Sequence, residues 1–137
     1  MLRRLWVLPV VFGLLALSAC SISVSTANLS DVKTGEKLKG SEVAKEVTVF
    51  SPDAPEIFAS AKLNNAPDGT KLTFTWRYLE KGGLDIDNVT VVTKNGQNVA
   101  NSSLSKPTRG WPVGEYEVVL KLGTQNSKPI HVKFKVE

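Results

Sequence analysis

The sequence predicts an all-β protein, an antiparallel sandwich of two sheets with about seven strands. From Glu46 onward, apolar and polar residues alternate with a period of two, which is the pattern of strands that bury one face. Clusters of Pro, Gly, Asn and Asp separate these segments, and no helical period extends beyond a few residues. Short strands with regular turns favour a sandwich, and a small closed barrel is the alternative.

Three strands are expected in the first half of this region, at residues 46–50, 57–63 and 71–78. The turn residues of segments 51–55 and 64–69 separate them. The third strand alternates most clearly, with four large side chains on one face: Leu72, Phe74, Trp76 and Tyr78. Lys81-Gly82-Gly83 ends this strand, and it lacks the spacing and the following helix of a phosphate-binding loop.

Four further strands are expected at residues 88–93, 99–104, 115–122 and 130–136. Asn95-Gly96 lies between the first two. This pair favours a primed turn, so it predicts a hairpin. Residues 123–127 turn the chain between the last two strands.

The N-terminus has the organisation of a secretory leader. Arg3 and Arg4 precede an apolar run, residues 5–17, which is too short to span a bilayer comfortably. Leu17-Ser18-Ala19-Cys20 follows, and it resembles the lipobox of bacterial lipoproteins. In that family the leader is cut before the cysteine, whose thiol takes a diacylglycerol and whose new amino group is often acylated. The resemblance implies a signal peptide at residues 1–19 and lipidation at Cys20; the alternative is a secreted protein with a chance cysteine.

The resemblance also implies a location in a bacterial cell envelope, lipid-anchored on the periplasmic face. Ser21 stands where an Asp acts as a retention signal in some Gram-negative bacteria, and this favours the outer membrane where there is one. Two or more acyl chains give stable anchoring. Arg3 and Arg4 leave with the leader, so the formal charge falls from +4 to +2 and gives no support for nucleic acid binding. After lipidation no thiol remains, so core packing alone must stabilise the fold.

Residues 20–45 are expected to form the lipidated N-terminus and a tether. Residues 21–30 are small and rich in hydroxyl groups, and residues 31–45 are rich in Lys and Glu with two glycines. A flexible coil of this length spans roughly 25–30 Å. A loosely attached first strand within residues 31–45 is the alternative, and the sandwich domain is placed at residues 46–137.

Residues 46–137 also resemble the immunoglobulin-like and fibronectin type III-like domains of bacterial envelope lipoproteins. Trp76 occupies the place of the core Trp in the third main strand, and Gly114-Glu115-Tyr116-Glu117-Val118 resembles the tyrosine-corner region. Other matching segments are Phe50-Ser51-Pro52, Gly69-Thr70 before Trp76, and Trp111-Pro112-Val113 before Gly114. Val118 stands where antibody domains have Cys, so the resemblance is to disulfide-free members. It implies an immunoglobulin-like sandwich, structural roles for Trp76 and Tyr116, and no catalytic residue.

The sequence shows no catalytic or metal-binding motif. His131, the only histidine, falls on the polar face of the last strand and is expected to be an exposed strand residue; a general base or a metal ligand is the alternative. No nucleophile elbow and no Cys/His cluster is present. Asp85-Ile86-Asp87-Asn88 offers oxygen ligands without the spacing of a calcium loop, and we interpret it as a polar loop between strands. We expect no cofactor, no metal and no enzymatic activity.

The best candidate contact is the loop at residues 105–112. Trp111 and Arg109 belong to the residue types that dominate binding interfaces, and a loop Trp can stack on a sugar. The favoured interpretation is that Trp111 closes the open end of the core and Arg109 covers it. The sequence therefore predicts a non-catalytic, membrane-tethered interaction or structural module with an envelope protein as partner. The alternative is a cell-wall glycan-binding module that uses Trp111 and Arg109.

Overall fold

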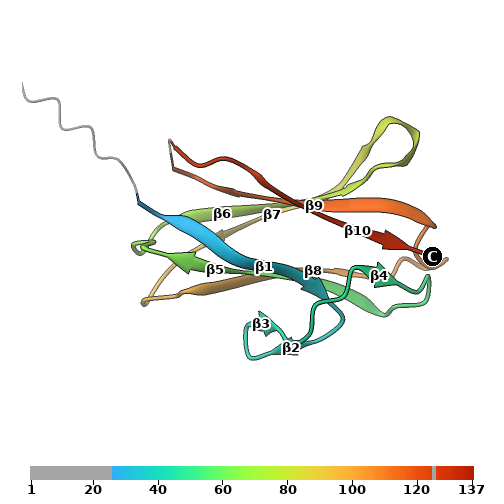
Figure 1. Ribbon diagram of the computed structural model, residues 1–137, viewed down its shortest axis with the longest axis horizontal. Helices are drawn as coiled ribbons and strands as arrows, with labels where there is room; N and C mark the ends of the chain where they lie inside the picture. Colours follow the sequence, from blue (N-terminus) through green and yellow to red (C-terminus); the bar gives the residue numbers. More distant parts are fainter. Residues whose placement is uncertain (1–25, 125) are drawn as a thin grey trace, which may run out of the picture.

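Two β-sheets pack face to face in the computed structural model, which describes residues 26–124 and 126–137 (Figure 1). The strand order is β1-β5-β8 in the smaller sheet and β4-β10-β9-β6-β7 in the larger one. The smaller sheet consists of β1 (Asn28–Gly35), β5 (Glu56–Asn64) and β8 (Val99–Ser105). The larger sheet consists of β4 (Val49–Phe50), β10 (Ile130–Val136), β9 (Gly114–Leu122), β6 (Lys71–Tyr78) and β7 (Leu84–Val92). The predicted two-sheet sandwich is confirmed, and its pairs are antiparallel except for the parallel pair of β4 with β10.

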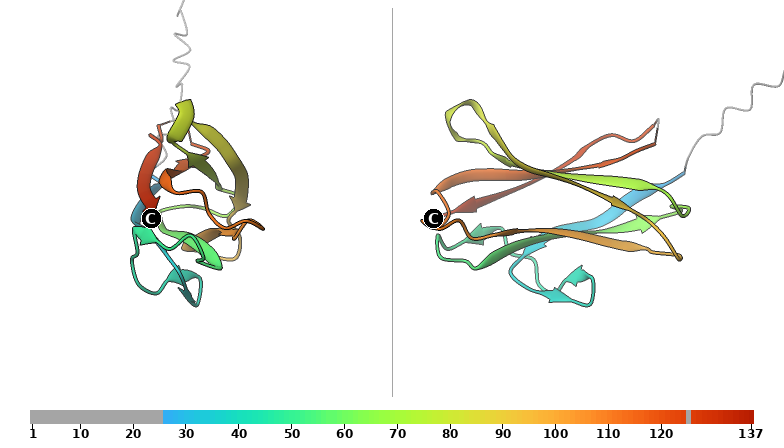
Figure 2. Two further views of the ribbon diagram at one scale, coloured as in Figure 1. Left: turned by 90° about the vertical axis from the view of Figure 1, so that its right-hand side faces the viewer. Right: turned by 180° about the vertical axis from the view of Figure 1, so that it is seen from behind.

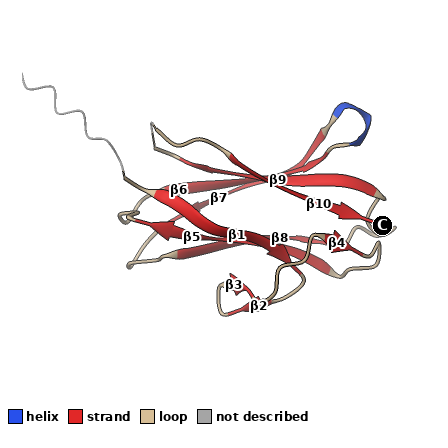
Figure 3. Cartoon of the chain, viewed as in Figure 1, coloured by secondary structure: helices blue, strands red, loops and turns tan. Residues whose placement is uncertain are grey.

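Short elements complete the described part of the chain (Figure 3). β2 (Leu38–Lys39) and β3 (Glu42–Val43) form a small hairpin, and the 3-10 turn η1 (Glu80–Gly82) lies between β6 and β7. The long strands run along the sandwich, so it has two ends (Figure 2). We call one of them the entry end; it holds the start of β1 and the β5–β6, β7–β8 and β9–β10 connections. We call the opposite one the far end; it holds the β6–β7 and β8–β9 connections and the C-terminus (Figure 1).

The core contains a cluster of aromatic rings around Phe134 of β10. Its ring centroid lies 5.5 Å from that of Phe50, 6.0 Å from that of Trp76 and 5.2 Å from that of Tyr116. Trp76 and Phe50 are fully buried, and Tyr116 is 1% exposed. Each such ring removes a large apolar area from water, so these side chains dominate the packing between the sheets.

Tyr116 closes the connection that precedes its own strand. It lies near the start of β9, and its hydroxyl donates a hydrogen bond to the carbonyl oxygen of Pro112, 2.6 Å away. This is the geometry of a tyrosine corner, in which a Tyr hydroxyl bonds back to backbone a few residues upstream. Gly114, between the two, has φ +142°, a value that side chains rarely adopt.

The sandwich begins earlier than the expected boundary at residue 46. β1 pairs with β5 along its length. Thr34 of β1 also forms two hydrogen bonds with Val47. The Val47 N–H donates to the Thr34 carbonyl at 2.8 Å, and the Thr34 hydroxyl donates to the Val47 carbonyl at 2.6 Å. The Val43 N–H donates to the Ser60 hydroxyl at 2.9 Å. Residues 28–45 therefore belong to the domain.

The strand expected at residues 46–50 is much shorter than predicted. Only Val49 and Phe50 form β4, at the edge of the larger sheet. The preceding Val47 is held by its two hydrogen bonds with Thr34 of β1 instead. The chain passes from the smaller sheet to the larger one at this point, so a period-two pattern spans two separate partners.

The predicted hairpin around Asn95-Gly96 is wrong as a strand pairing. The turn itself forms, because Asn95 (φ 54°) and Gly96 (φ 71°) both take positive φ and the Gln97 N–H bonds to the Lys94 carbonyl at 3.1 Å. However, β7 pairs with β6 and β8 pairs with β5, so the turn carries the chain from one sheet to the other. Turn chemistry fixes where the chain reverses, whereas burial of Ala100 and Ser102 on the core side decides where β8 pairs.

Candidate functional site

β7 is the outermost strand of the larger sheet beside β6. One of its sides pairs with β6, and none of the described strands pairs with the other. The backbone N–H and C=O groups on that side are available to another extended chain, which is why exposed edges act as docking sites. Apart from Val89 and Val91, all the residues of β7 are exposed.

A β-bulge changes the direction of side chains at the far end of β7. Trp76 lies opposite Asp87 and Arg77 lies opposite Asp85, so Ile86 is an extra residue without a partner on β6. Bulges of this kind bend an edge strand and redirect a side chain. Here the redirected side chain is that of Ile86, which is 42% exposed.

An apolar hollow of about 160 Å³ lies between this part of β7 and the β8–β9 connection. Its lining consists of Tyr78, Leu84, Ile86, Pro107, Trp111, Pro112 and Tyr116. Leu84 is 64% exposed and Val113, in the same connection, is 62% exposed. We call Leu84, Ile86 and Val113, with this hollow, the far-end apolar surface. Grouped exposed apolar side chains on a soluble domain mark interaction sites more often than scattered ones do.

The wall of the hollow is held by hydrogen bonds from its aromatic residues. The Trp111 indole Nε1 donates to the Ala54 carbonyl at 2.7 Å, and the Tyr78 hydroxyl donates to the Val113 carbonyl at 2.8 Å. The ring centroids of Tyr78 and Tyr116 are 4.7 Å apart, and those of Trp111 and Tyr116 are 6.3 Å apart. These hydrogen bonds and ring contacts fix the positions of the aromatic side chains that line the hollow.

Trp111 and Arg109 do not form a joint binding platform. Trp111 is 4% exposed and belongs to the core cluster, as expected if its side chain closes the open end of the core. Arg109, in contrast, is exposed. Gly110 (φ 79°) turns the chain between them, and the Trp111 N–H donates to the Pro52 carbonyl at 2.9 Å. The indole offers no open face for stacking on a sugar ring.

A polar network crosses the outer face of the larger sheet. Glu117 of β9, whose side chain is 6% exposed, accepts from Arg77 Nη1 at 3.1 Å and lies 3.0 Å from His131 Nδ1. Arg77 also bonds through Nε to Asp85 at 2.8 Å. These two carboxylates, Asp85 first and Glu117 second, raise the pKa of Arg77. Sequence reasoning missed Glu117, because only the alignment of β6, β9 and β10 brings its partners together.

His131 lies where the sequence places it, half-exposed on the outer face of β10. Glu117 orients its ring, as a catalytic histidine requires. Within residues 26–124 and 126–137, no side-chain hydroxyl forms a hydrogen bond to His131.

The acidic segment at residues 85–88 lies in β7 and not in the loop that we expected. Asp85 is engaged by Arg77, and Asp87 Oδ1 accepts from the Asn88 N–H at 2.8 Å. Among the described residues, no group of three or more His, Cys, Asp or Glu side chains is arranged to hold a metal ion.

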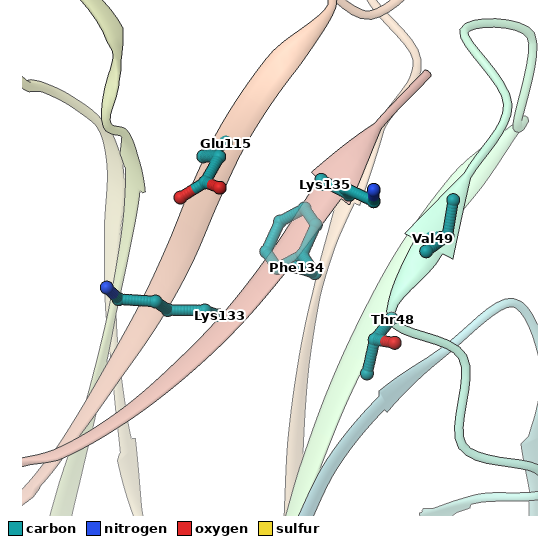
Figure 4. A pocket seen from close by; sticks show the side chains of 6 residues that line it. All are labelled: Thr48, Val49, Glu115, Lys133, Phe134 and Lys135. Carbon is teal, nitrogen blue, oxygen red and sulfur yellow. The ribbon is translucent and has the colours of Figure 1, made fainter.

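A second hollow, of about 220 Å³, lies on the outer face beside β4 (Figure 4). It is lined by Thr48, Val49, Glu115, Lys133, Phe134 and Lys135. Lys133 points away from β4 (Figure 4). Lys135 forms an ion pair with Glu137 at 3.1 Å. A small-molecule site requires polar groups that converge on one point, and the charged groups of this hollow do not converge in that way.

Cys20, the expected lipidation site, lies outside the described residues. In the part of the chain that the structure covers, no helix has the length and apolar character needed to cross a membrane.

No family model matches the chain, and no curated protein matches its sequence. Among solved structures, a β-glucosidase from Erythrobacter marinus is similar over 82% of this chain, with 10% sequence identity and a TM-score of 0.48. This chain spans 15% of that enzyme's length. At this level of similarity nothing follows about activity, so function rests on the residues described above.

Proposed function

We propose that this protein is a non-catalytic, lipid-anchored module of a bacterial cell envelope that binds an envelope protein at its far end. The secretory leader and the Leu17-Ser18-Ala19-Cys20 segment support the anchor, because they supply an export signal and a thiol at the first residue after cleavage. The domain then sits on the periplasmic face, at the outer membrane in a Gram-negative cell.

The far-end apolar surface carries the proposal of a protein partner. Leu84, Ile86 and Val113 are among the few large apolar side chains in the described residues that face solvent. Leu84 and Ile86 line the hollow, and Val113 follows Pro112, another residue of its lining. Exposing them has a cost in water that a partner would remove. The hollow is smaller than the roughly 300–1,000 Å³ of small-molecule pockets, so it fits a side chain of a protein better than a separate ligand.

Strand addition at β7 is the binding mode that uses both features. An extended segment of the partner pairs with the outer side of β7 through its backbone, and one apolar side chain enters the hollow beside Ile86. Asp87 lies on the same strand, so a segment with a basic residue near its apolar anchor would also match in charge.

A site-specific photo-crosslinker tests this proposal in living cells. We place it at Ile86, and at Val92 as the matched control, since Val92 is 48% exposed on the same strand near the entry end. The proposal predicts a discrete adduct from Ile86, absent from Val92 and lost when Leu84→Lys is added. Leu84 is largely exposed, so this change should alter stability by no more than about 0.5 kcal/mol.

Two results would contradict the proposal. One is the same set of adducts from Ile86 and Val92; the other is an Ile86 adduct that Leu84→Lys leaves unchanged. Binding of purified cell-wall glycan that depends on Arg109 would instead favour the glycan alternative.

A further inference from the structure

The entry end of the sandwich concentrates positive charge. Four exposed lysines lie there: Lys71 at the start of β6, Lys94 in the β7–β8 turn, Lys121 near the end of β9, and Lys128 before β10. None of the four forms an ion pair within the described residues. Lys62 is also near this end, but it is engaged by Asp31 and Glu42.

Hydrogen bonds hold the elements that carry these lysines at one end. The Gly123 N–H donates to the Lys71 carbonyl at 2.8 Å, which joins the end of β9 to the start of β6. Asp68, in the β5–β6 connection, accepts from the N–H groups of Asn95 and Gly96 beside Lys94, at 3.1 Å each. Asp68 is the acidic residue of these connections, and four lysines against one carboxylate leave this end positive.

The start of the described chain lies at the same end. Asn64, the last residue of β5, donates from its side-chain amide to Asn28 at 2.9 Å, so β1 begins beside the β5–β6 connection. Figure 1 shows that the start of β1 and the three connections share one end, opposite the C-terminus. Seven residues separate Cys20 from Asn28, and such a segment extends at most about 29 Å.

The far end differs in charge. Its acidic residues are Asp53, Glu56, Glu80, Asp85, Asp87, Glu115 and Glu137. Its basic residues are Arg77, Lys81, Lys106, Arg109 and Lys135, of which Arg77 and Lys135 are paired with acids. Acids outnumber bases at the far end, so the positive end is the one that an anionic surface attracts.

We infer that the entry end is a docking surface for anionic phospholipid headgroups, which holds the sandwich upright on the bilayer with the far-end apolar surface directed away from it. Lysines within a screening length of an anionic surface are attracted to it, and that length is about 8 Å at physiological salt. The anchor keeps these lysines close to the surface, which raises their local concentration there. The inference rests on the proposed anchor for this proximity, and on the lysine placement for the lipid chemistry.

Fluorescence quenching in vesicles tests the orientation with the mature lipidated protein. Acylation consumes the Cys20 thiol, so one new cysteine takes the fluorophore: Asn98→Cys at the entry end or Thr108→Cys at the far end, both exposed. The vesicles are phosphatidylcholine alone or mixed with phosphatidylglycerol, with a quencher on the headgroups. We expect the Asn98 label to be quenched at least about two-fold more in anionic vesicles, the Thr108 label to change little, and the difference to vanish at 1 M salt, where screening acts within about 3 Å.

A charge-matched pair of variants identifies the lysines. Replacing Lys71, Lys94, Lys121 and Lys128 by Gln should abolish the anionic enhancement at Asn98. Replacing Lys37, Lys39, Lys45 and Lys81, which are exposed elsewhere, should preserve it. Equal quenching of Asn98 in both vesicle types, or equal effects of the two variants, overturns the inference.

Flotation separates this inference from the proposed anchor. If Cys20 carries no lipid, the protein will not float with neutral vesicles, and the proposed anchor fails. The docking surface then still predicts flotation with anionic vesicles that the entry-end Lys→Gln variant loses. If the protein without lipid, with its entry-end lysines intact, does not float with anionic vesicles, the inference of a docking surface is overturned as well.

Discussion

The indole of Trp76 and the hydroxyl of Ser102 join the two sheets through the middle of the core. Trp76 Nε1 in β6 donates to Ser102 Oγ in β8 at 3.0 Å, and both side chains are buried. Val118 of β9 lies opposite Trp76 of β6 and is fully buried as well. A hydrogen bond and apolar packing therefore connect the two sheets at this point.

Ser102→Ala is expected to destabilise the protein by about 1–3 kcal/mol, because it leaves the Trp76 N–H buried without an acceptor. Urea unfolding monitored by Trp fluorescence measures the change. Ser105→Ala, at the exposed end of the same strand, is the control and should stay within about 0.5 kcal/mol of the wild type. Equal stability of the two variants would show that the indole finds another partner.

Tyr116→Phe removes the hydrogen bond to Pro112 and should cost about 1–3 kcal/mol at neutral pH. Tyr78→Phe is the comparison, since its bond to Val113 is exposed and its loss should cost less. Chemical denaturation of both variants gives the difference. A larger loss in Tyr78→Phe would contradict a structural role for the tyrosine corner.

The same residue predicts a loss of stability at alkaline pH. Burial, and second the neighbouring Tyr78, raise the pKa of Tyr116 from 10.0 to about 12. Above pH 10 the unfolded chain gives up this proton while the folded chain keeps it, so the folded state loses stability as the pH rises from 10 through about 12. The free energy of unfolding, measured by denaturation at several pH values in this range, should fall more steeply with pH for the wild type than for Tyr116→Phe. The same pH dependence in both proteins would rule out this contribution.

The parts of the fold that the sequence predicts are those where one strand buries one face. The alternation in residues 71–78 identifies Leu72, Phe74 and Trp76 as core, because a period of two translates directly into side-chain direction. β1 escapes this reasoning. Its inward side relies on small and polar groups such as Thr34, whose burial is possible only because Val47 supplies hydrogen-bond partners from a later segment.

The candidate sites depend on relationships that no single segment displays. Ile86 reaches the hollow because of a bulge, an irregularity that a repeating pattern conceals. Glu117 reads as an exposed residue on a polar face, yet the alignment of β6 and β10 on either side of β9 brings Arg77 and His131 over it and buries it. The entry-end lysines are spread from residue 71 to residue 128 and come together only through the topology.

Gly35→Ala tests whether the N-terminal segment belongs to the cooperative unit. A Cβ at Gly35 would collide with Val43 Cγ1 and lie 2.5 Å from the Lys45 carbonyl oxygen. Overpacking of this kind typically costs about 1–3 kcal/mol. Thermal unfolding should show one transition at a lower temperature, whereas Lys39→Ala, exposed on the neighbouring hairpin, should leave it in place. An unchanged transition in Gly35→Ala would mean that residues 28–45 unfold independently.

Glu117→Gln tests the network on the outer face. The change keeps the shape but removes the charge that Arg77 and His131 share, and hydrogen bonds to charged groups contribute about 1.5–3 kcal/mol. We expect a loss of that size at pH 7 by urea unfolding. Glu115→Gln, exposed on the same strand, should leave the free energy of unfolding almost unchanged. Equal losses in the two variants would show that Glu117 contributes no more to stability than an exposed charge does.

Trp111→Ala separates packing from recognition at the β8–β9 connection. Because the indole is 4% exposed, donates to the Ala54 carbonyl and packs on Tyr116, its truncation should cost about 3–5 kcal/mol. Arg109→Ala, in contrast, removes an exposed side chain and should change stability by no more than about 0.5 kcal/mol. The decisive comparison is urea unfolding together with a pulldown on purified cell wall. If Trp111→Ala abolishes the pulldown while stability barely changes, the ring must leave the core to bind a sugar, and the glycan alternative is correct.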